Sequence, residues 1–115
     1  MIIKDVNKVC IVDIEGTTIS QADIAGLNSL ISKKTKRRIG IDMKSVLNVN
    51  HDFIEFISSS VAKNKISLFN VNNDVFLMLF VLKQEKNVSL YLSESDFLSD
   101  ENSIFYRRLK VVKAA

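Results

Sequence analysis

The feature that most limits the fold of this chain is the alternation of short apolar runs with segments of helical spacing. Runs rich in isoleucine, leucine and valine are typical of buried strands, and they lie at residues 39–43, 66–69 and 88–92. Helices are expected to begin before the first run, after Ser20, and between the runs, after Asn50 and Asn72. Strands that follow one another through a helix pair in parallel with right-handed crossovers. The pattern therefore predicts an α/β fold with a mostly parallel sheet.

The N-terminal residues add a strand pair to this sheet. Residues 2–6 and 8–14 are expected to be strands joined by a tight turn at Asn7-Lys8. Both faces of the second strand are largely apolar, which predicts a place near the sheet centre. The full prediction is a mixed sheet of about five strands with an N-terminal antiparallel hairpin and three to four helices. Ser93 with Asp96 can cap the last of these helices.

Length and composition bound the organisation of the chain. A chain of 115 residues with 47% hydrophobic residues can form one domain with a real core. We expect residues 1–98 to form it and residues 99–115 to be a C-terminal extension packed on or flanking it. The longest apolar run, residues 75–82, is too short to span a membrane, so no direct membrane insertion is expected. The single cysteine, Cys10, lies in a predicted strand, which favours a buried hydrophobe and a reducing cytoplasm.

Few residues of the kinds used for catalysis, metal binding or phosphate binding are present. His51 is the only histidine, and no paired His or Cys motif of zinc spacing is present. The three glycines are isolated, so no phosphate-binding loop is predicted. These observations argue against an enzyme, and no catalytic residue, metal or cofactor is expected. Asp42 ends a strand, where carboxylates gather in α/β folds, and it also suits a capping or turn role.

The net charge of +3 is unevenly distributed. Basic residues cluster at 33–38 and at 107–113, without interleaved aromatic residues. The first cluster is typical of a solvated helix end, where cations suit the negative pole of the dipole. Nucleic acid is therefore not an expected partner.

The turn into the second helix is the segment whose polarity looks functional. Asn50, His51 and Asp52 lie where a helix exposes its free N–H groups. Asp52 has two interpretations. As a helix-stabilising acid it contributes about 0.3–1 kcal/mol and needs no partner. As a fixed negative charge it is a carboxylate that a partner protein can bind.

The stretch around this turn resembles the STAS family, the anti-sigma-factor antagonists and their relatives. Ile41-Asp42-Met43 stands for the L-D-L part of the family pattern, and Val46 for its loop valine. Residues 50–54, NHDFI, fall where D-S-S-G-L usually begins a helix. The resemblance covers about residues 2–98. Asp52 occupies the place of the serine that is phosphorylated in signalling members, so the usual phosphorylation switch is not expected here.

The resemblance implies a non-catalytic protein–protein interaction module, an anti-sigma-factor antagonist-type regulator that cannot be phosphorylated at the usual position. Its partner would be an anti-sigma or switch-kinase protein, in signal transduction and transcription regulation. The contact residues would be Asn50, His51, Asp52, Phe53, Glu55 and Phe56. The alternative is an accessory subunit of a membrane transport ATPase complex.

The helix expected after Asn72 is apolar around its circumference, from Val75 to Leu82. A surface helix normally shows a stripe of about 100°. This helix must therefore be covered on more than one side or expose an apolar patch. One hypothesis is a homodimer or partner interface that includes Phe76, Met78, Leu79 and Phe80. The other is cover by the C-terminal segment, through Ile104, Phe105 and Leu109.

Overall fold

The computed structural model describes residues 1–6, 9–33, 38–59, 66–84 and 87–99, and it confirms the predicted α/β fold. The described elements are β1 (Ile2–Val6), β2 (Val9–Asp13), α1 (Gln21–Lys33), β3 (Ile39–Asp42), α2 (His51–Ser58), β4 (Ile66–Phe69), α3 (Asn73–Val81), β5 (Ser89–Tyr91) and α4 (Glu94–Ser99). The predicted turn at residues 7–8, most of both basic clusters and residues 100–115 lie outside the described residues.

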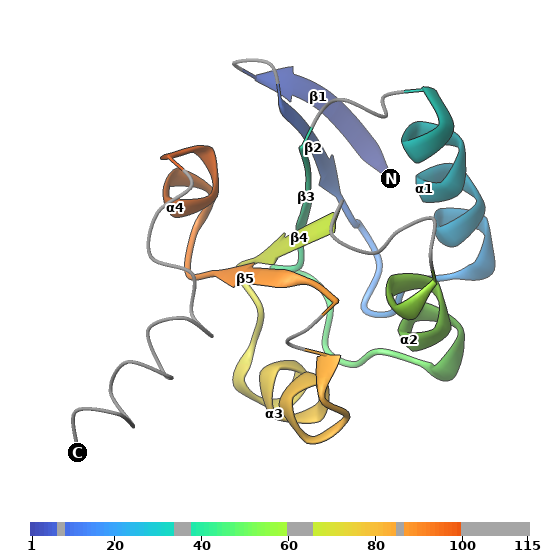
Figure 1. The fold of residues 1–115 in the computed structure, drawn as a ribbon, viewed down its shortest axis with the longest axis vertical. Helices are drawn as coiled ribbons and strands as arrows, with labels where there is room; N and C mark the ends of the chain where they lie inside the picture. Colours follow the sequence, from blue (N-terminus) through green and yellow to red (C-terminus); the bar gives the residue numbers. More distant parts are fainter. Residues whose placement is uncertain (7–8, 34–37, 60–65, 85–86, 100–115) are drawn as a thin grey trace.

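The five strands form one mixed sheet in the order β1-β2-β3-β4-β5. β1 runs antiparallel to β2, with Val6 opposite Val9, and the other neighbours pair in parallel. Each crossover helix therefore steps one strand further in the same direction. Right-handed crossovers that all step the same way place their helices on one face of the sheet. Figure 1 shows α1 and α2 on one side and α4 on the other.

The sheet separates two apolar cores of unequal size. The larger core lies between the sheet and α1, α2 and α3, and it includes Cys10, Leu27 and Phe53 among its buried residues. The smaller core lies on the opposite face and consists of Val9, Ile11, Phe69, Tyr91 and Phe97, the last of these from α4. The prediction that both faces of this second strand, β2, are apolar is confirmed, because its residues face the two cores in turn. Both faces of the central strands are therefore buried.

The four helices begin where the sequence predicts. Ser20 and Asp23 bond each other's backbone N–H reciprocally, each at 3.1 Å, which is a capping-box arrangement. Asn50 and Asn72 cap α2 and α3, and the Ser93 hydroxyl accepts from the backbone N–H of Asp96 at 3.3 Å. Short polar side chains at these positions satisfy backbone donors that a helix leaves unpaired.

The predicted helix ends are less accurate. We expected the second helix to reach about residue 63, but α2 ends at Ser58. Ser58 and Ser59 donate their hydroxyls to the carbonyls of Ile54 and Phe56, and Ser59 adopts an extended conformation. Serine competes for helix carbonyls in this way, which favours termination. The sequence also predicts that the third helix reaches about Lys83, but α3 ends at Val81, and Lys83 has a φ of 59°. In the described part of the chain, no helix has the length and apolar character needed to cross a membrane.

Candidate functional site

The first turn of α2 is tied to the chain that precedes α1 through Asn50. The Asn50 Oδ1 accepts from the backbone N–H of Phe53 at 2.9 Å. Its Nδ2 donates to the carbonyl of Ile19 at 3.1 Å. One amide group therefore both begins α2 and fixes that beginning against the loop before α1. This double use positions the two helices relative to each other.

Asp52 lies in the first turn of α2 with a partly exposed side chain. Its Oδ2 accepts a hydrogen bond of 3.1 Å from Nε2 of Gln21, the first residue of α1. The carboxylate is therefore at the surface and bridges the N-termini of both helices. A negative charge is favourable there because both helices present partly positive ends.

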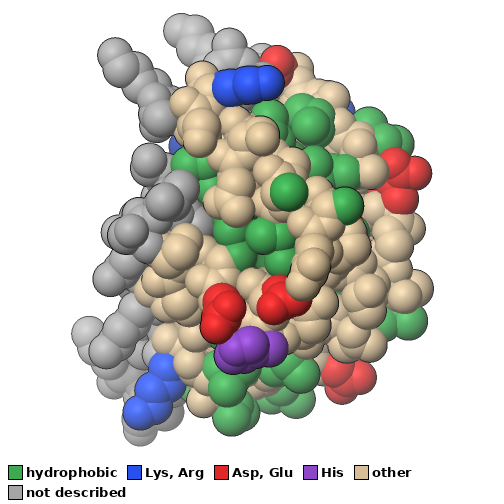
Figure 2. Space-filling model, turned by 90° about the vertical axis from the view of Figure 1, so that its right-hand side faces the viewer, with side chains coloured by type: hydrophobic (Ala, Val, Ile, Leu, Met, Phe, Trp, Pro, Cys, Tyr) green, Lys and Arg blue, Asp and Glu red, His purple; other side chains and the backbone are tan. Residues whose placement is uncertain are grey.

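His51 and Asp52 do not contact each other, because neighbouring helical residues point about 100° apart. His51 instead pairs with Glu55 one turn later, with 3.0 Å between Nε2 and Oε1. Both side chains are well exposed, so this pair is a surface contact. Figure 2 shows the single histidine in purple beside acidic side chains on this face.

A groove of about 390 Å³ runs between α1 and α2. Its apolar floor comes from Ile24 and Phe56, and its polar rim is formed by Gln21, Asn28, Asp52, Glu55 and Ser59. The rim holds two carboxylates and none of the lining residues is basic. A groove of this composition suits a ligand that combines an apolar portion with a cation or a hydrogen-bond donor.

Three predicted contact or interface residues, Phe53, Phe76 and Leu79, lie in the core, and Phe56 is nearly buried at the groove. Phe53 is fully buried and cannot meet a partner, because residues of the large core surround it. Phe56 is 5% exposed and contributes only to the floor of the groove. Phe76 and Leu79 of α3 also face the core, whereas Met78 and Phe80 are exposed. The reason is shared: these side chains lie on the face of α2 or α3 that packs against the sheet.

The α1 wall of the groove is not predicted from the sequence. Gln21, Ile24 and Asn28 are spaced by three and four residues, which places them on one face of α1. That spacing is visible in the sequence. It indicates a groove wall only once α1 is known to lie beside α2, and this long-range contact is not visible in the sequence.

A second polar cluster lies at the carboxyl ends of β2, β3 and β4. Asp13 and Asp42 are register partners, and Lys44 Nζ lies 3.4 Å from a carboxylate oxygen of each. Asp42 Oδ1 also accepts from the Lys44 backbone N–H and from Asn70 Nδ2, both at 3.1 Å. The charge of Asp42, followed by the contact with Asp13, raises the pKa of Lys44. The sequence alone allows Asp42 either a chemical role at the strand end or a capping or turn role. These hydrogen bonds give it the turn role.

No group of three or more His, Cys, Asp or Glu side chains suited to a metal ion occurs within the described ranges. Comparison with known proteins adds no assignment to this geometry. No family model matches the sequence, and no curated protein matches it.

Proposed function

We propose that this protein is a STAS-like protein–protein interaction module, an anti-sigma-factor antagonist-type regulator that acts in the cytoplasm. The observation that carries the proposal is the position of Asp52. Its carboxylate lies at the surface, at the start of α2, on the rim of the groove between α1 and α2. The sequence resemblance puts the regulatory serine of the family at this residue.

The groove suggests what the partner presents. Its apolar floor and acidic rim suit a basic side chain with an apolar stem, such as arginine or lysine. The stem would lie on Ile24 and Phe56, and the charged head would meet Asp52 or Glu55. Asp52 would act as a permanent negative charge, with roughly half the charge of a phosphoserine. We infer a partner that is bound constitutively and is not released by a phosphorylation cycle.

A matched pair of variants tests the role of Asp52. Asp52 and Asp74 each lie two residues after an asparagine N-cap, in α2 and α3. Asp52→Asn and Asp74→Asn therefore remove the same helix-terminal charge at two sites, and only Asp52 lines the groove. Wild type and both variants serve as full-chain baits in the source cell, and the captured partner is then purified for calorimetry. We expect Asp52→Asn to weaken binding roughly tenfold to a hundredfold, the value of a hydrogen bond to a charged group. Asp74→Asn should bind like wild type, and equal affinity for all three proteins would refute the proposal.

Asp52→Ser adds a second measurement on the same partner. If the partner is a switch kinase, incubation with ATP should place phosphate on the serine variant and not on wild type. Partner affinity should fall on Asp52→Ser and recover once the phosphate is present. A serine variant that binds as tightly as wild type without modification would leave only the helix-stabilising role of Asp52.

A second candidate is an accessory subunit of a membrane transport ATPase. The apolar outer side of α3 favours it, because permanent interfaces are more hydrophobic than transient ones. The class of ATPase that the bait captures separates the two candidates. A kinase-type ATPase supports the regulator, and a transport-type ATPase supports the accessory subunit.

A further inference from the structure

We propose that the outer face of α3 is a self-association surface that joins two copies of this chain with their α3 helices antiparallel. This inference is independent of the regulator proposed above, because no residue of α3 lines the groove. It competes with the accessory-subunit candidate, which would use the same face of α3.

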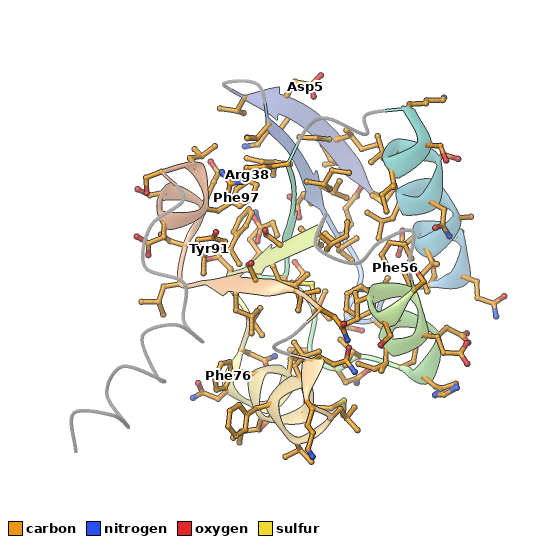
Figure 3. All side chains as sticks on the ribbon, viewed as in Figure 1. Asp5, Arg38, Phe56, Phe76, Tyr91 and Phe97 are labelled. Carbon is orange, nitrogen blue, oxygen red and sulfur yellow. The ribbon has the colours of Figure 1, made fainter. Side chains whose placement is uncertain are left out.

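The exposed apolar residues of α3 lie on one face of the helix. Val75, Phe76 and Leu79 turn towards the large core. Leu77, Met78, Val81 and Leu82 are 54%, 39%, 73% and 47% exposed. Together with Asp74 they follow the spacing i, i+3, i+4, i+7 and i+8, which defines one continuous helix face. On an ordinary surface helix this face carries polar residues, whereas here it is apolar apart from its first member. Figure 3 shows α3 at the periphery of the molecule, with Phe76 on it labelled.

The size of this face matches one side of a dimer interface. With Phe80, which is 49% exposed, five apolar side chains lie at the surface of α3 and the turn that follows it. At about half exposure each, they offer on the order of 400–500 Å² of apolar surface, the size of a functional patch. A standard interface buries about 800 Å² on each partner, and homodimer interfaces are about 65% apolar. The α3 face thus supplies close to the whole apolar share of such an interface.

The charges at the two ends of the face indicate a second copy as its occupant. Asp74 lies at the N-terminal end of the apolar stripe, and Lys83 follows it at the C-terminal end. A two-fold axis between the two α3 helices, at their midpoints, places the N-terminal end of each helix beside the C-terminal end of the other. Asp74 of one copy then faces Lys83 of the other, twice per dimer, while Leu77 faces Phe80. A head-to-head parallel arrangement would instead oppose like charges.

The first test compares two substitutions of the same kind at equal exposure. Leu77 is 54% exposed on α3, and Ile2 is 55% exposed on β1, at the far edge of the sheet from β5. Light scattering after size exclusion is recorded on the full chain between about 5 and 500 µM, the range that reveals weak to moderate dimers. We expect wild type and Ile2→Glu to form the same dimer. Leu77→Glu should raise the dissociation constant at least tenfold, with unchanged circular dichroism. A wild type that stays monomeric throughout, or a dimer that Leu77→Glu leaves intact, would overturn the proposal.

Charge exchange tests the antiparallel arrangement. Asp74→Lys and Lys83→Asp should each weaken the dimer severalfold, and the double variant should recover most of the loss because the opposite charges meet again. Aspartate is suited to position 83, where the backbone is left-handed. Failure of the double variant to recover would exclude the two-fold pairing. A face occupied by residues 100–115 of the same chain would give no recovery and no concentration dependence.

Discussion

At the scale of single residues, the described part of the chain buries two polar side chains, Asp42 and Gln84, and both are hydrogen-bonded. Gln84 Oε1 accepts from Asn87 and lies 3.0 Å from the Ser58 hydroxyl oxygen, and Gln84 Nε2 donates to the carbonyl of Leu82. Asp42 accepts from a backbone N–H, an amide and the Lys44 ammonium. Buried polar groups without partners are costly, and each of these joins segments that are distant in sequence. Their role is to fix loops at the edge of the sheet.

The Asp42–Lys44 contact gives a prediction about the pKa of Lys44. The charge of Asp42 and the hydrogen bond and charge of Asp13 all raise this pKa, so Asp42→Asn and Asp13→Asn should each lower it. Both variants remove one carboxylate at the same distance from Nζ, so each serves as the control for the other. The measurement is an NMR titration of the Lys44 side chain. An unchanged Lys44 pKa in either variant would contradict this origin of the shift.

The raised pKa of Lys44 also sets the pH range in which its contact with Asp42 and Asp13 stabilises the fold. A lysine whose folded pKa is raised stabilises the folded state fully below its unfolded pKa. Here that limit is near the ordinary lysine value of 10.5, and the contribution is lost as the pH rises through the folded pKa. At neutral pH the contact is therefore intact.

At the scale of elements, the sequence predicts where helices begin far better than where they end or what they meet. Asn50, Asn72 and Ser20 are local signals, because the bonds they accept lie within three residues. The end of α2 depends on serine hydroxyls that bond in a competing way, which periodicity does not reveal. Asp52 lies at the surface, as its place at a helix start predicts. Its bond to Gln21 and the groove could not be predicted, because both depend on α1 and α2 being neighbours.

The N-cap of α3 illustrates an element-scale prediction. Asn72 Oδ1 accepts from the Val75 N–H at 2.8 Å, and Nδ2 donates to the carbonyl of Val46 at 3.0 Å. Asn72→Ala loses both bonds and should lower the free energy of unfolding by about 1–2 kcal/mol. Asn72→Asp keeps the cap and loses only the amide donor, so its cost should be smaller. Urea denaturation measures both, with exposed Asn73→Ala as a neighbouring control. An equal cost for Ala and Asp at position 72 would assign the stabilisation to the Val46 bond alone.

At the scale of the whole molecule, the two faces of the sheet are covered unequally. Three crossover helices lie on one face because every crossover steps in the same direction. Among the described elements, only α4 covers the other face, and Phe97 is its buried residue. Phe97 stacks on Phe69 at 5.6 Å, meets Tyr91 edge-on at 5.8 Å, and lies beneath the Arg38 guanidinium at 4.3 Å. Figure 3 shows Arg38, Tyr91 and Phe97 together between the sheet and α4.

The absence of a side chain at Gly40 lets α4 approach the sheet. A Cβ at Gly40 would lie 2.6 Å from two atoms of the Phe97 ring, which is held by Phe69, Tyr91 and Arg38. Gly40→Ala should therefore displace Phe97 and lower the free energy of unfolding by about 1–3 kcal/mol. Hydrogen exchange should accelerate at the Phe97 amide, which bonds the Ser93 carbonyl, before it accelerates in β2 and β3.

Gly26→Ala is the control, since it makes the same change in the interior of α1. Its Cβ would meet only the terminal methyl and sulfur of Met1, which are the far end of a flexible side chain. Alanine favours a helix interior over glycine by roughly 0.5–1 kcal/mol, so Gly26→Ala should be neutral or stabilising. The two substitutions should differ in their effect on the free energy of unfolding because the added Cβ meets different neighbours. At Gly40 it meets a ring that is fixed on three sides, and at Gly26 it meets a movable chain end. If Gly40→Ala unfolded the strands and α4 together, α4 would belong to the same cooperative unit as the sheet and would not be a separately opening cover.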